Sequence, residues 1–203
     1  VLSVALELGI DVKCLTDINK KKHGKKVLGV KILGNDSILG AFGPDRFDLA
    51  MGIGVGSDSH QLTIQLERRF KIFTRLSSQG YSFPSLIHPK AVVAQECSIG
   101  NGIQIFSGSI IQPNCSIGDL SILNTKSSVD HDCSIGKASH IAPGVTCGGN
   151  VKIGAHAHIG IGAIILPNTN IKDNSIVAAG SVVNADVNVG EKVGGTPARL
   201  MVK

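Results

Sequence analysis

Aliphatic residues recur every six positions along the second half of the chain. Stepping by six from Ile87 to Val183 meets seventeen positions, of which sixteen are aliphatic, and the step holds without one insertion. A small residue often stands two positions earlier, as at Ser109, Cys115 and Ser121. Neither an α-helix nor an ordinary strand has this period, whereas hexapeptide repeats are typical of a parallel β-helix. The pattern therefore predicts a solenoid of stacked coils.

The first eighty or so residues follow other periods. Helical patterns cover residues 1–9, 35–42 and 62–79, and strand-like patterns cover 12–16 and 47–55. The last helix carries an apolar face and Gly80 is expected to end it; the face consists of Leu62, Leu66, Phe70, Phe73 and Leu76. Strands that alternate with helices favour a small, Rossmann-like parallel sheet, whose ligands lie at the carboxyl ends of the strands.

Two domains follow from this change of period. We expect an α/β, Rossmann-like domain over residues 1–82 and a β-helix over residues 83–203 that ends in a C-terminal cap. The chain starts at Val1, inside the first helical pattern and without an initiator Met, so we expect a segment upstream.

Composition narrows the functional classes. The chain has 203 residues, 42% of them hydrophobic and 17% charged, which is ordinary for a folded globular protein. A net charge of +5, without a sustained basic and aromatic pattern, argues against a nucleic-acid module. Five cysteines, an odd number, and no secretory segment favour a reducing cytoplasm. No continuous apolar stretch approaches the length of a membrane span, so no membrane insertion is expected.

The hexad pattern resembles the left-handed parallel β-helix of the hexapeptide-repeat acyltransferases, in which three hexads form one triangular coil. Residues 18 apart then lie one above another at about 4.8 Å. This arithmetic stacks His140 on His158 and His131 on Gly149. It also places Cys133 in an inward column, so we interpret its thiol as structural. His131 and His140 are half a coil apart, so they can meet at one site only through a second copy of the chain.

The segment "SSVDHDCSIG" contains the strongest candidate for chemistry. Judged by residue type alone, His131 with Asp132 fits either a polar corner of a coil or a general base with its orienting carboxylate. A zinc site of the gamma carbonic anhydrase type would need an H-x4-H pair, whereas this chain has "HAH" at His156 and His158. We therefore expect no metal, and we expect both of these histidines to be exposed on the coil, with His158 near a ligand groove.

The stretch from Asn124 to Gly154, together with "CLTD" and "MGIGVG", resembles the bacterial nucleotide-sugar acetyltransferases. These include sialic acid O-acetyltransferases and the N-acetyltransferases of 4-amino-sugar nucleotides in the bacillosamine and perosamine pathways. The resemblance implies that His131 is the general base, that Asp132 orients it and that the Gly149 amide polarises the thioester carbonyl. It assigns contacts with acetyl-CoA to His140, Ile161 and Ala179, and an acceptor-facing place to Asn124.

Two further sets of contacts follow from the same resemblance. The C-terminal "GTPAR" places Arg199 near a phosphate of coenzyme A, although a capping role fits this tail equally. Thr16, Asp17 and Gly54 would contact the base and ribose of the nucleotide. Family members begin with a strand and a glycine-rich turn, whereas this chain starts inside the helix that follows them.

The resemblance thus predicts a cytoplasmic homotrimer with active sites between subunits and acetyl-CoA as co-substrate. The expected reaction is N-acetylation of the 4-amino group of a nucleotide-linked deoxysugar, in the biosynthesis of a surface glycan. The alternatives are sugar or sialic acid O-acetylation, a zinc hydratase, and a binding scaffold without activity.

Overall fold

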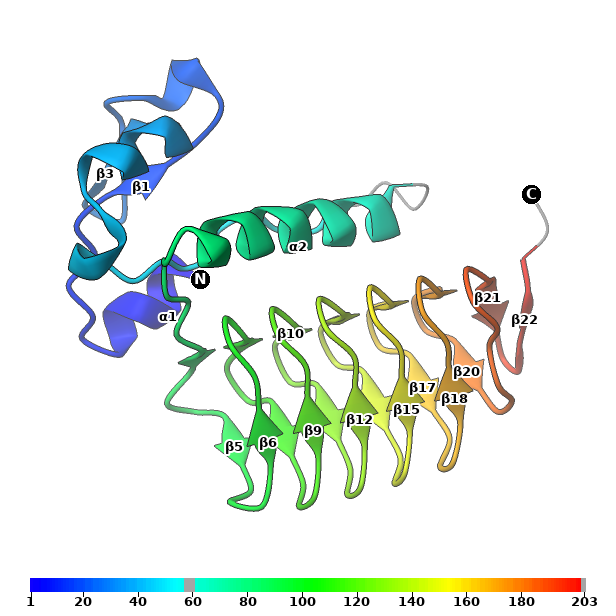
Figure 1. Cartoon of the computed structure of the whole chain (residues 1–203). Coiled ribbons are helices and arrows are strands. Elements are labelled where there is room, and N and C mark those ends of the chain that lie inside the picture. The colour runs from blue at the N-terminus through cyan, green and yellow to red at the C-terminus, as the bar shows by residue number, and fades with distance from the viewer. Residues whose placement is uncertain (57–60, 202–203) are drawn as a thin grey trace.

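The computed structural model describes residues 1–56 and 61–201. A small N-terminal part with short strands precedes one long helix, α2 (Leu62–Ser78), which runs along a β-helix (Figure 1). Within the described residues, no helix is long and apolar enough to cross a membrane.

Seventeen strands of two residues each build the β-helix. Each ends on one of the positions of the aliphatic repeat, so the predicted solenoid is confirmed. The strands are β4 (Leu86–Ile87), β5 (Val92–Val93), β6 (Ser98–Ile99), β7 (Gln104–Ile105), β8 (Ile110–Ile111), β9 (Ser116–Ile117), β10 (Ile122–Leu123), β11 (Ser128–Val129), β12 (Ser134–Ile135), β13 (His140–Ile141), β14 (Thr146–Cys147), β15 (Lys152–Ile153), β16 (His158–Ile159), β17 (Ile164–Ile165), β18 (Asn170–Ile171), β19 (Ile176–Val177) and β20 (Val182–Val183).

These strands form three parallel sheets, which are the faces of a prism. The first face has the order β19-β16-β13-β10-β7-β4, the second β20-β17-β14-β11-β8-β5, and the third β18-β15-β12-β9-β6. Paired residues are 18 apart, as for Ile122 with His140 and Ser128 with Thr146. The chain visits the first, second and third faces in turn, so three hexads make one coil. The hairpin of β21 (Lys192–Gly195) and β22 (Ala198–Leu200) continues the first face beyond β19.

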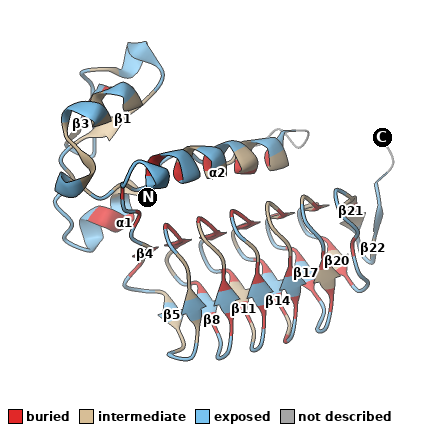
Figure 2. Ribbon diagram, viewed as in Figure 1, coloured by how far each residue is buried: buried red, intermediate tan, exposed pale blue. Residues whose placement is uncertain are grey.

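The interior of the prism is a stack of aliphatic side chains with small residues between them. Buried residues recur along the coils (Figure 2). The hydroxyls and thiols of the small positions donate across the coil, as from Ser121 to the carbonyl of Gly136 at 2.9 Å and from Cys133 to that of Gly148 at 3.2 Å. Cys133 is buried, and burial raises the pKa of its thiol. The thiol is therefore part of the core, as the column arithmetic predicts.

From Gly102 to Gly180, the corners of the prism have a left-handed backbone once in every hexad. Asn114, Asp132, Asn150 and Asn168 have φ of 60°, 60°, 56° and 63°, and each stands at the same position of the turn between the second and third faces. Asn and Asp tolerate this conformation better than most residues, because their short side chains bond the local backbone. Asp132 is thus compatible with the geometry of its turn.

The N-terminal part contains less sheet than the sequence pattern predicts. Its elements are α1 (Leu2–Glu7), β1 (Leu15–Thr16), the 3₁₀ helix η1 (Lys20–Lys22), β2 (Lys26–Val27), β3 (Val30–Gly34), and the 3₁₀ helices η2 (Asp36–Ala41) and η3 (Pro44–Arg46). The sheet order is β1-β3-β2, with β1 and β3 parallel and β2 antiparallel to β3.

The strand predicted over residues 47–55 is wrong, because this segment pairs with no strand within the described residues. One backbone bond, from Leu49 N–H to the carbonyl of Ser82 at 2.8 Å, and two side chains hold it instead. Gln104 Nε2 donates to the carbonyl of Met51 at 2.6 Å, and Arg69 Nε donates to that of Ile53 at 2.7 Å. An apolar run can be buried against a helix without entering a ladder, and its periodicity does not distinguish the two cases.

Helix α2 covers the first face, and its predicted apolar side is confirmed. Leu62, Leu66, Phe73 and Leu76 are buried, and Gly80, with φ of 93°, follows the helix end. Phe73 packs with Phe83 and Leu120 in a second core cluster outside the prism.

Two histidines lie differently from our expectation. His156 and His158 are only partly exposed, because α2 lies over them; the ring of Phe70 packs edge-on against His156 at 5.4 Å between centroids. The hexad fixes that these residues point outward, but it carries no information about which element covers the outside of the coil.

Candidate active site

His131 and Asp132 form a pair at the corner between β11 and β12. His131 Nδ1 lies 2.7 Å from Asp132 Oδ2, and the imidazole side chain is 60% exposed. The Asp130 carboxylate accepts from the backbone N–H of His131 at 2.8 Å, which fixes the start of the turn. The hydrogen bond to Asp132 raises the pKa of His131, and the same bond lowers the pKa of Asp132.

Gly149 lies one coil further on, directly against the His131 ring. A Cβ atom at Gly149 would stand 2.7 Å from both Cε1 and Nε2 of His131. No side chain fits there while the ring keeps its place, so the glycine lets the imidazole lie on the backbone. The Gly149 N–H forms no hydrogen bond within the described residues. An imidazole and a glycine whose amide has no partner among these residues therefore lie against each other.

Asn114 adds a second contact to this pair and was missed from the sequence. Its Nδ2 donates to Asp132 Oδ1 at 3.2 Å, one coil before Asp132. Asp132 thus has one oxygen toward His131 and the other toward Asn114, so both of its oxygens are engaged. The same 18-residue arithmetic that pairs His131 with Gly149 points to Asn114.

A second cluster lies at the corner between the first and second faces. Asn124 Nδ2 lies 3.2 Å from His140 Nε2, and Asn124 Oδ1 accepts from the backbone N–H of Thr125 at 2.8 Å. The second bond identifies Oδ1 as the acceptor side of the amide, so Nδ2 donates to His140. Ile161 and Ala179 stand at the same corner in later coils, and both are exposed.

His140 is more enclosed than a residue that only lines an open groove. It is 8% exposed beneath α2, and its ring packs edge-on against His158 at 5.0 Å between centroids. Burial, followed by His158 and Arg69, lowers the pKa of His140 to about 3, and burial lowers that of His158 to about 4. Both imidazoles are therefore neutral at physiological pH.

The two clusters lie at opposite edges of the second face of one chain. The face begins at the Asn124 corner (residues 124–126, 142–144, 160–162 and 178–180) and ends at the His131 corner (residues 130–132 and 148–150). Between them, the outward side chains of Val92, Ile110 and Ile164 are exposed. One chain therefore carries both clusters, but at opposite edges of one face, so the two clusters do not meet within that chain.

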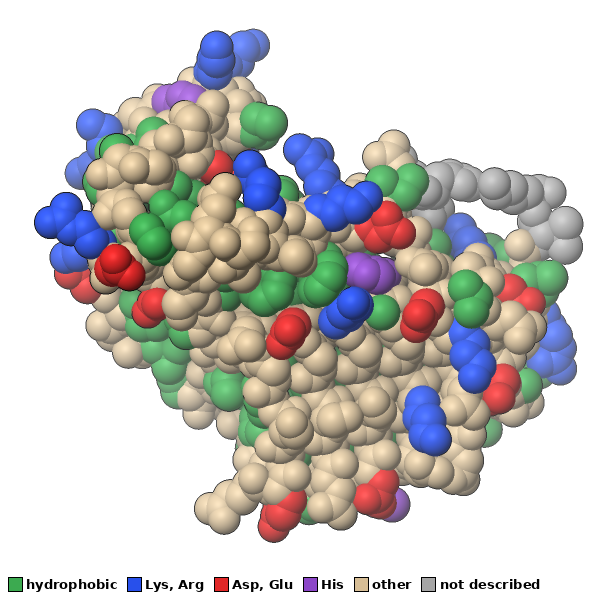
Figure 3. Space-filling model, in the orientation of Figure 1, with side chains coloured by type: hydrophobic (Ala, Val, Ile, Leu, Met, Phe, Trp, Pro, Cys, Tyr) green, Lys and Arg blue, Asp and Glu red, His purple; other side chains and the backbone are tan. Residues whose placement is uncertain are grey.

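The residues expected to contact a nucleotide belong to the N-terminal part, and in the sequence they stand well before both corners. Thr16 Oγ1 donates to Asp36 Oδ1 at 2.7 Å, where β1 and β3 end. Asp17 pairs with Lys22 at 2.7 Å, which lowers the pKa of the aspartate. Gly54 is exposed in the extended segment that Arg69 and Gln104 hold. Lysine and arginine side chains gather around the N-terminal part and α2 (Figure 3).

Arg199 lies in β22, on the hairpin that follows the last coil. Its side chain is exposed, and Nη1 donates to the carbonyl of Ala198 at 2.8 Å. The position is compatible with both roles considered for it, a phosphate contact and a cap.

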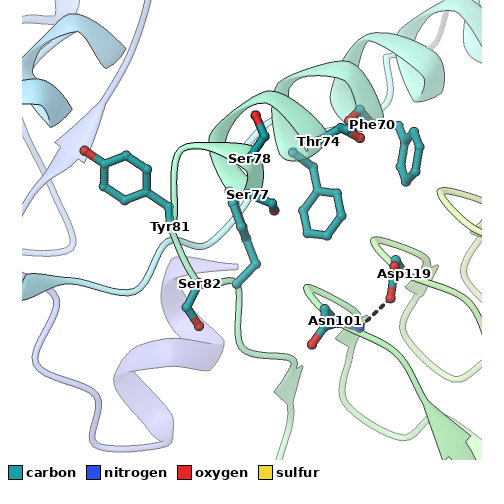
Figure 4. A pocket seen from close by; sticks show the side chains of 10 residues that line it. Phe70, Thr74, Ser77, Ser78, Tyr81, Ser82, Asn101 and Asp119 are labelled. Atoms are coloured by element: carbon teal, nitrogen blue, oxygen red, sulfur yellow. Dashed lines mark hydrogen bonds between the residues drawn. The ribbon is translucent and has the colours of Figure 1, made fainter. Parts of the chain in front are cut away.

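A hollow of about 580 Å³ opens between α2 and the corner that joins the third and first faces (Figure 4). Phe70, Thr74 and Tyr81 line it from the helix side, with Asn101 and Asp119 opposite. The Asp119 carboxylate accepts from the backbone N–H of Asn101 at 2.8 Å, which serves the turn. The hollow belongs to neither cluster. Within residues 1–56 and 61–201, no group of three His, Cys, Asp or Glu side chains is placed to hold a metal.

Stacked hexads with a histidine at one corner define a class, the hexapeptide-repeat transferases. Residues 150–185 match the family described as bacterial transferase hexapeptide (six repeats). None of the curated proteins matches the chain.

Solved structures narrow this class. A mutant perosamine N-acetyltransferase from Caulobacter crescentus, in complex with CoA and GDP-perosamine, is 30% identical with a TM-score of 0.89, over 100% of this chain and 90% of that one. The acetyltransferase domain of PglB from Neisseria gonorrhoeae is 28% identical with a TM-score of 0.88, over 98% and 92%. WeeI from Acinetobacter baumannii is 27% identical with a TM-score of 0.80, over 98% and 91%. The chain belongs to the family of 4-amino-sugar N-acetyltransferases, which confirms the resemblance seen in the sequence.

Proposed function

We propose that the protein transfers the acetyl group of acetyl-CoA to the 4-amino group of a nucleotide-linked amino-deoxysugar. The observation that carries this proposal is the His131 corner, where an oriented imidazole lies against Gly149, whose amide has no hydrogen-bond partner within the described residues. The related Caulobacter enzyme was solved with CoA and GDP-perosamine, and the PglB domain with acetyl coenzyme A, which supports the same pair of substrates here.

The reaction assigns a role to each group at the corner. With Nδ1–H donated to Asp132, His131 presents the lone pair of Nε2 to the acceptor amine. As the amine nitrogen bonds to the thioester carbon, Nε2 takes its proton and the Gly149 amide donates to the carbonyl oxygen that becomes an oxyanion. The C–S bond then breaks, and the protonated imidazole returns the proton to the leaving thiolate. Amide and free coenzyme A are formed without a covalent enzyme intermediate.

A homotrimer would join the two halves of the site. A threefold arrangement with the second faces inward would bury Val92, Ile110 and Ile164 and set the His131 corner of one copy against the Asn124 corner of the next. Asn124 would then face the acceptor, and His140, Ile161 and Ala179 would line the acetyl-CoA side, with Arg199 near a phosphate. The coil is left-handed in this proposal, as in the hexapeptide-repeat acyltransferases.

Residues 1–82 serve as the nucleotide-sugar domain in this proposal, and residues 83–203 as the acyltransferase domain. Thr16 and Asp17 follow a strand of the one parallel pair, where ligands of α/β sheets bind, and Gly54 offers an exposed backbone. We place the N-terminal domain in the Rossmann-like class and the protein in the cytoplasm, where acetyl-CoA is available for glycan biosynthesis.

Release of the coenzyme A thiol in the presence of candidate acceptors tests the function. GDP-, UDP- and dTDP-linked 4-amino sugars are compared with sialic acid, which offers only hydroxyl acceptors. We expect release with at least one amine and none with sialic acid. Release with sialic acid alone would replace the proposal by O-acetylation, and failure with every acceptor would leave only a binding role.

His131→Ala tests the assignment of the base. We expect it to abolish transfer while the oligomer and the melting temperature stay unchanged, because the side chain is exposed. Gln95→Ala is a matched control, since Gln95 occupies the same turn position two coils earlier and is also exposed. Retained activity in His131→Ala would remove His131 from its role.

A further inference from the structure

Arg69 is a charged side chain enclosed completely between α2 and the first face, with 0% exposed. Its Nε donates to the carbonyl of Ile53 at 2.7 Å. Nη1 and Nη2 are also buried, but they reach no acceptor, and no ion pair among the described residues includes Arg69. Burial lowers the pKa of Arg69 only to about 10, so the group is charged at neutral pH. A buried charge without a counter-charge is strongly destabilising.

His140 adds a second unpaired donor to the same region. Because Asn124 Nδ2 donates to His140 Nε2, the neutral ring must carry its proton on Nδ1. That nitrogen is buried and has no partner. The charge of Arg69 contributes to the low pKa of His140, after burial and His158, which is consistent with the guanidinium lying close to this ring.

Counted over the described residues, the cluster therefore has hydrogen-bond donors and a positive charge in surplus. His158 Nδ1 is also buried without a partner, and its ring is 5.0 Å from that of His140. Neutral imidazoles supply no negative charge, and the guanidinium repels a metal cation. Native structures rarely leave several such groups unsatisfied in one place, and an unseen ion is one of the standard explanations.

We propose that Arg69 and His140 bind a small monovalent anion, of the size of chloride, between α2 and the first face of the β-helix. The anion must be small, because Leu66 and Phe73 on either side of Arg69 are buried in the same interface. It would receive hydrogen bonds from the guanidinium and from Nδ1–H of His140. The site shares His140 with the acetyl-CoA side of the proposed function, but it does not depend on which acceptor is acetylated.

Occupancy of the site would join three parts of the molecule. Arg69 holds the carbonyl of Ile53, beside Gly54, and His140 holds the Asn124 amide. An anion between Arg69 and His140 would therefore stabilise the docking of α2 together with the segment 51–56. The expected consequence is stability that depends on the identity of the anion and not on ionic strength alone.

Two measurements on the unaltered protein test the site. In crystals grown or soaked with bromide, we expect an anomalous peak within hydrogen-bond distance of the Arg69 Nη atoms and His140 Nδ1. In solution, we expect the melting temperature in sodium chloride to exceed that in sodium gluconate at equal ionic strength. The difference should reach about 3 °C at an anion concentration about ten times the dissociation constant.

Matched variants assign the effect to the site. Arg69→Met should abolish the difference between the two salts, whereas Arg68→Met, which alters the exposed neighbour on α2, should keep it. A water molecule in place of bromide at Arg69, or equal melting temperatures in the two salts, would overturn the proposal. If Arg69→Met does not fold, the bromide map and the salt comparison on the unaltered protein still decide.

Discussion

Replacing Gly149 by alanine separates the position of the His131 ring, the proposed general base, from the stability of the fold. The added Cβ would stand 2.7 Å from Cε1 and Nε2 of His131, whereas non-bonded heavy atoms of this kind are comfortable at about 3.5 Å or more. The overlap is therefore roughly 0.8 Å, and the exposed imidazole is the group that can yield. Gly149 is not among the residues with positive φ, so alanine suits its backbone.

The predicted result is a large loss of activity with little loss of stability. A displacement of about 1 Å at the reacting groups can cost roughly a hundredfold in rate, and we expect kcat/KM for thiol release to fall by about this factor. The melting temperature should change by less than about 3 °C, since the ring turns into solvent and leaves the core intact.

The control for this variant is an alanine at the neighbouring Gly148, whose Cβ would meet Pro167 and not the His131 ring. Gly148→Ala should instead destabilise the fold, because its Cβ would stand 2.7 Å from Pro167 Cγ and 2.9 Å from Pro167 N, which cannot turn away. Unchanged kcat/KM in Gly149→Ala, or an activity loss matched by a fall in melting temperature like that of Gly148→Ala, would refute the reasoning.

Three further outcomes are expected. Asp132→Asn keeps the left-handed turn but removes the charge, so the pKa of His131 should fall. The acid limb of the pH–rate profile should then move to lower pH, with a reduced maximal rate. An unmoved limb would contradict this expectation. In the folded protein the pKa of His140 is lowered from 6.5 to about 3. The neutral His140 side chain therefore contributes fully to the stability of the fold above about pH 6.5, and this contribution is lost as the pH falls. Urea unfolding should show about 2 kcal/mol less stability at pH 5 than at pH 7 from this residue, and His140→Gln should remove that difference. Ile164→Glu should yield folded, inactive monomers in sedimentation experiments, whereas Lys152→Glu on the third face should leave the oligomer and its activity unchanged.

The sequence was sufficient to predict the β-helix because one rule governs every coil. Each aliphatic position from Ile87 to Val183 ends a strand, with only Cys147 outside the aliphatic set. The same rule stacks His131 on Gly149, and the glycine contact follows from it. Periodicity is reliable here because inward and outward positions are fixed by the geometry of the turn.

What lies outside the prism could not be predicted in the same way. The pattern at residues 47–55 indicates an apolar segment, but not that Gln104 and Arg69 would hold it in place of a neighbouring strand. Nor does the hexad show that α2 covers His140 and His158, because that contact depends on tertiary packing between distant segments. Arg69 stands among the apolar positions of α2, and that placement was the available signal of its burial.

The uniform coil also determines which insertions the site can survive. Each hexad turns the chain by one third of a revolution, so an insertion of six residues between His131 and Gly149 would move the glycine to another face, away from the His131 ring. An insertion of 18 residues beyond Val177, by contrast, would add a whole coil and leave both corners in register. Evolution can therefore lengthen this enzyme in steps of one coil, whereas shorter steps rotate its halves out of alignment.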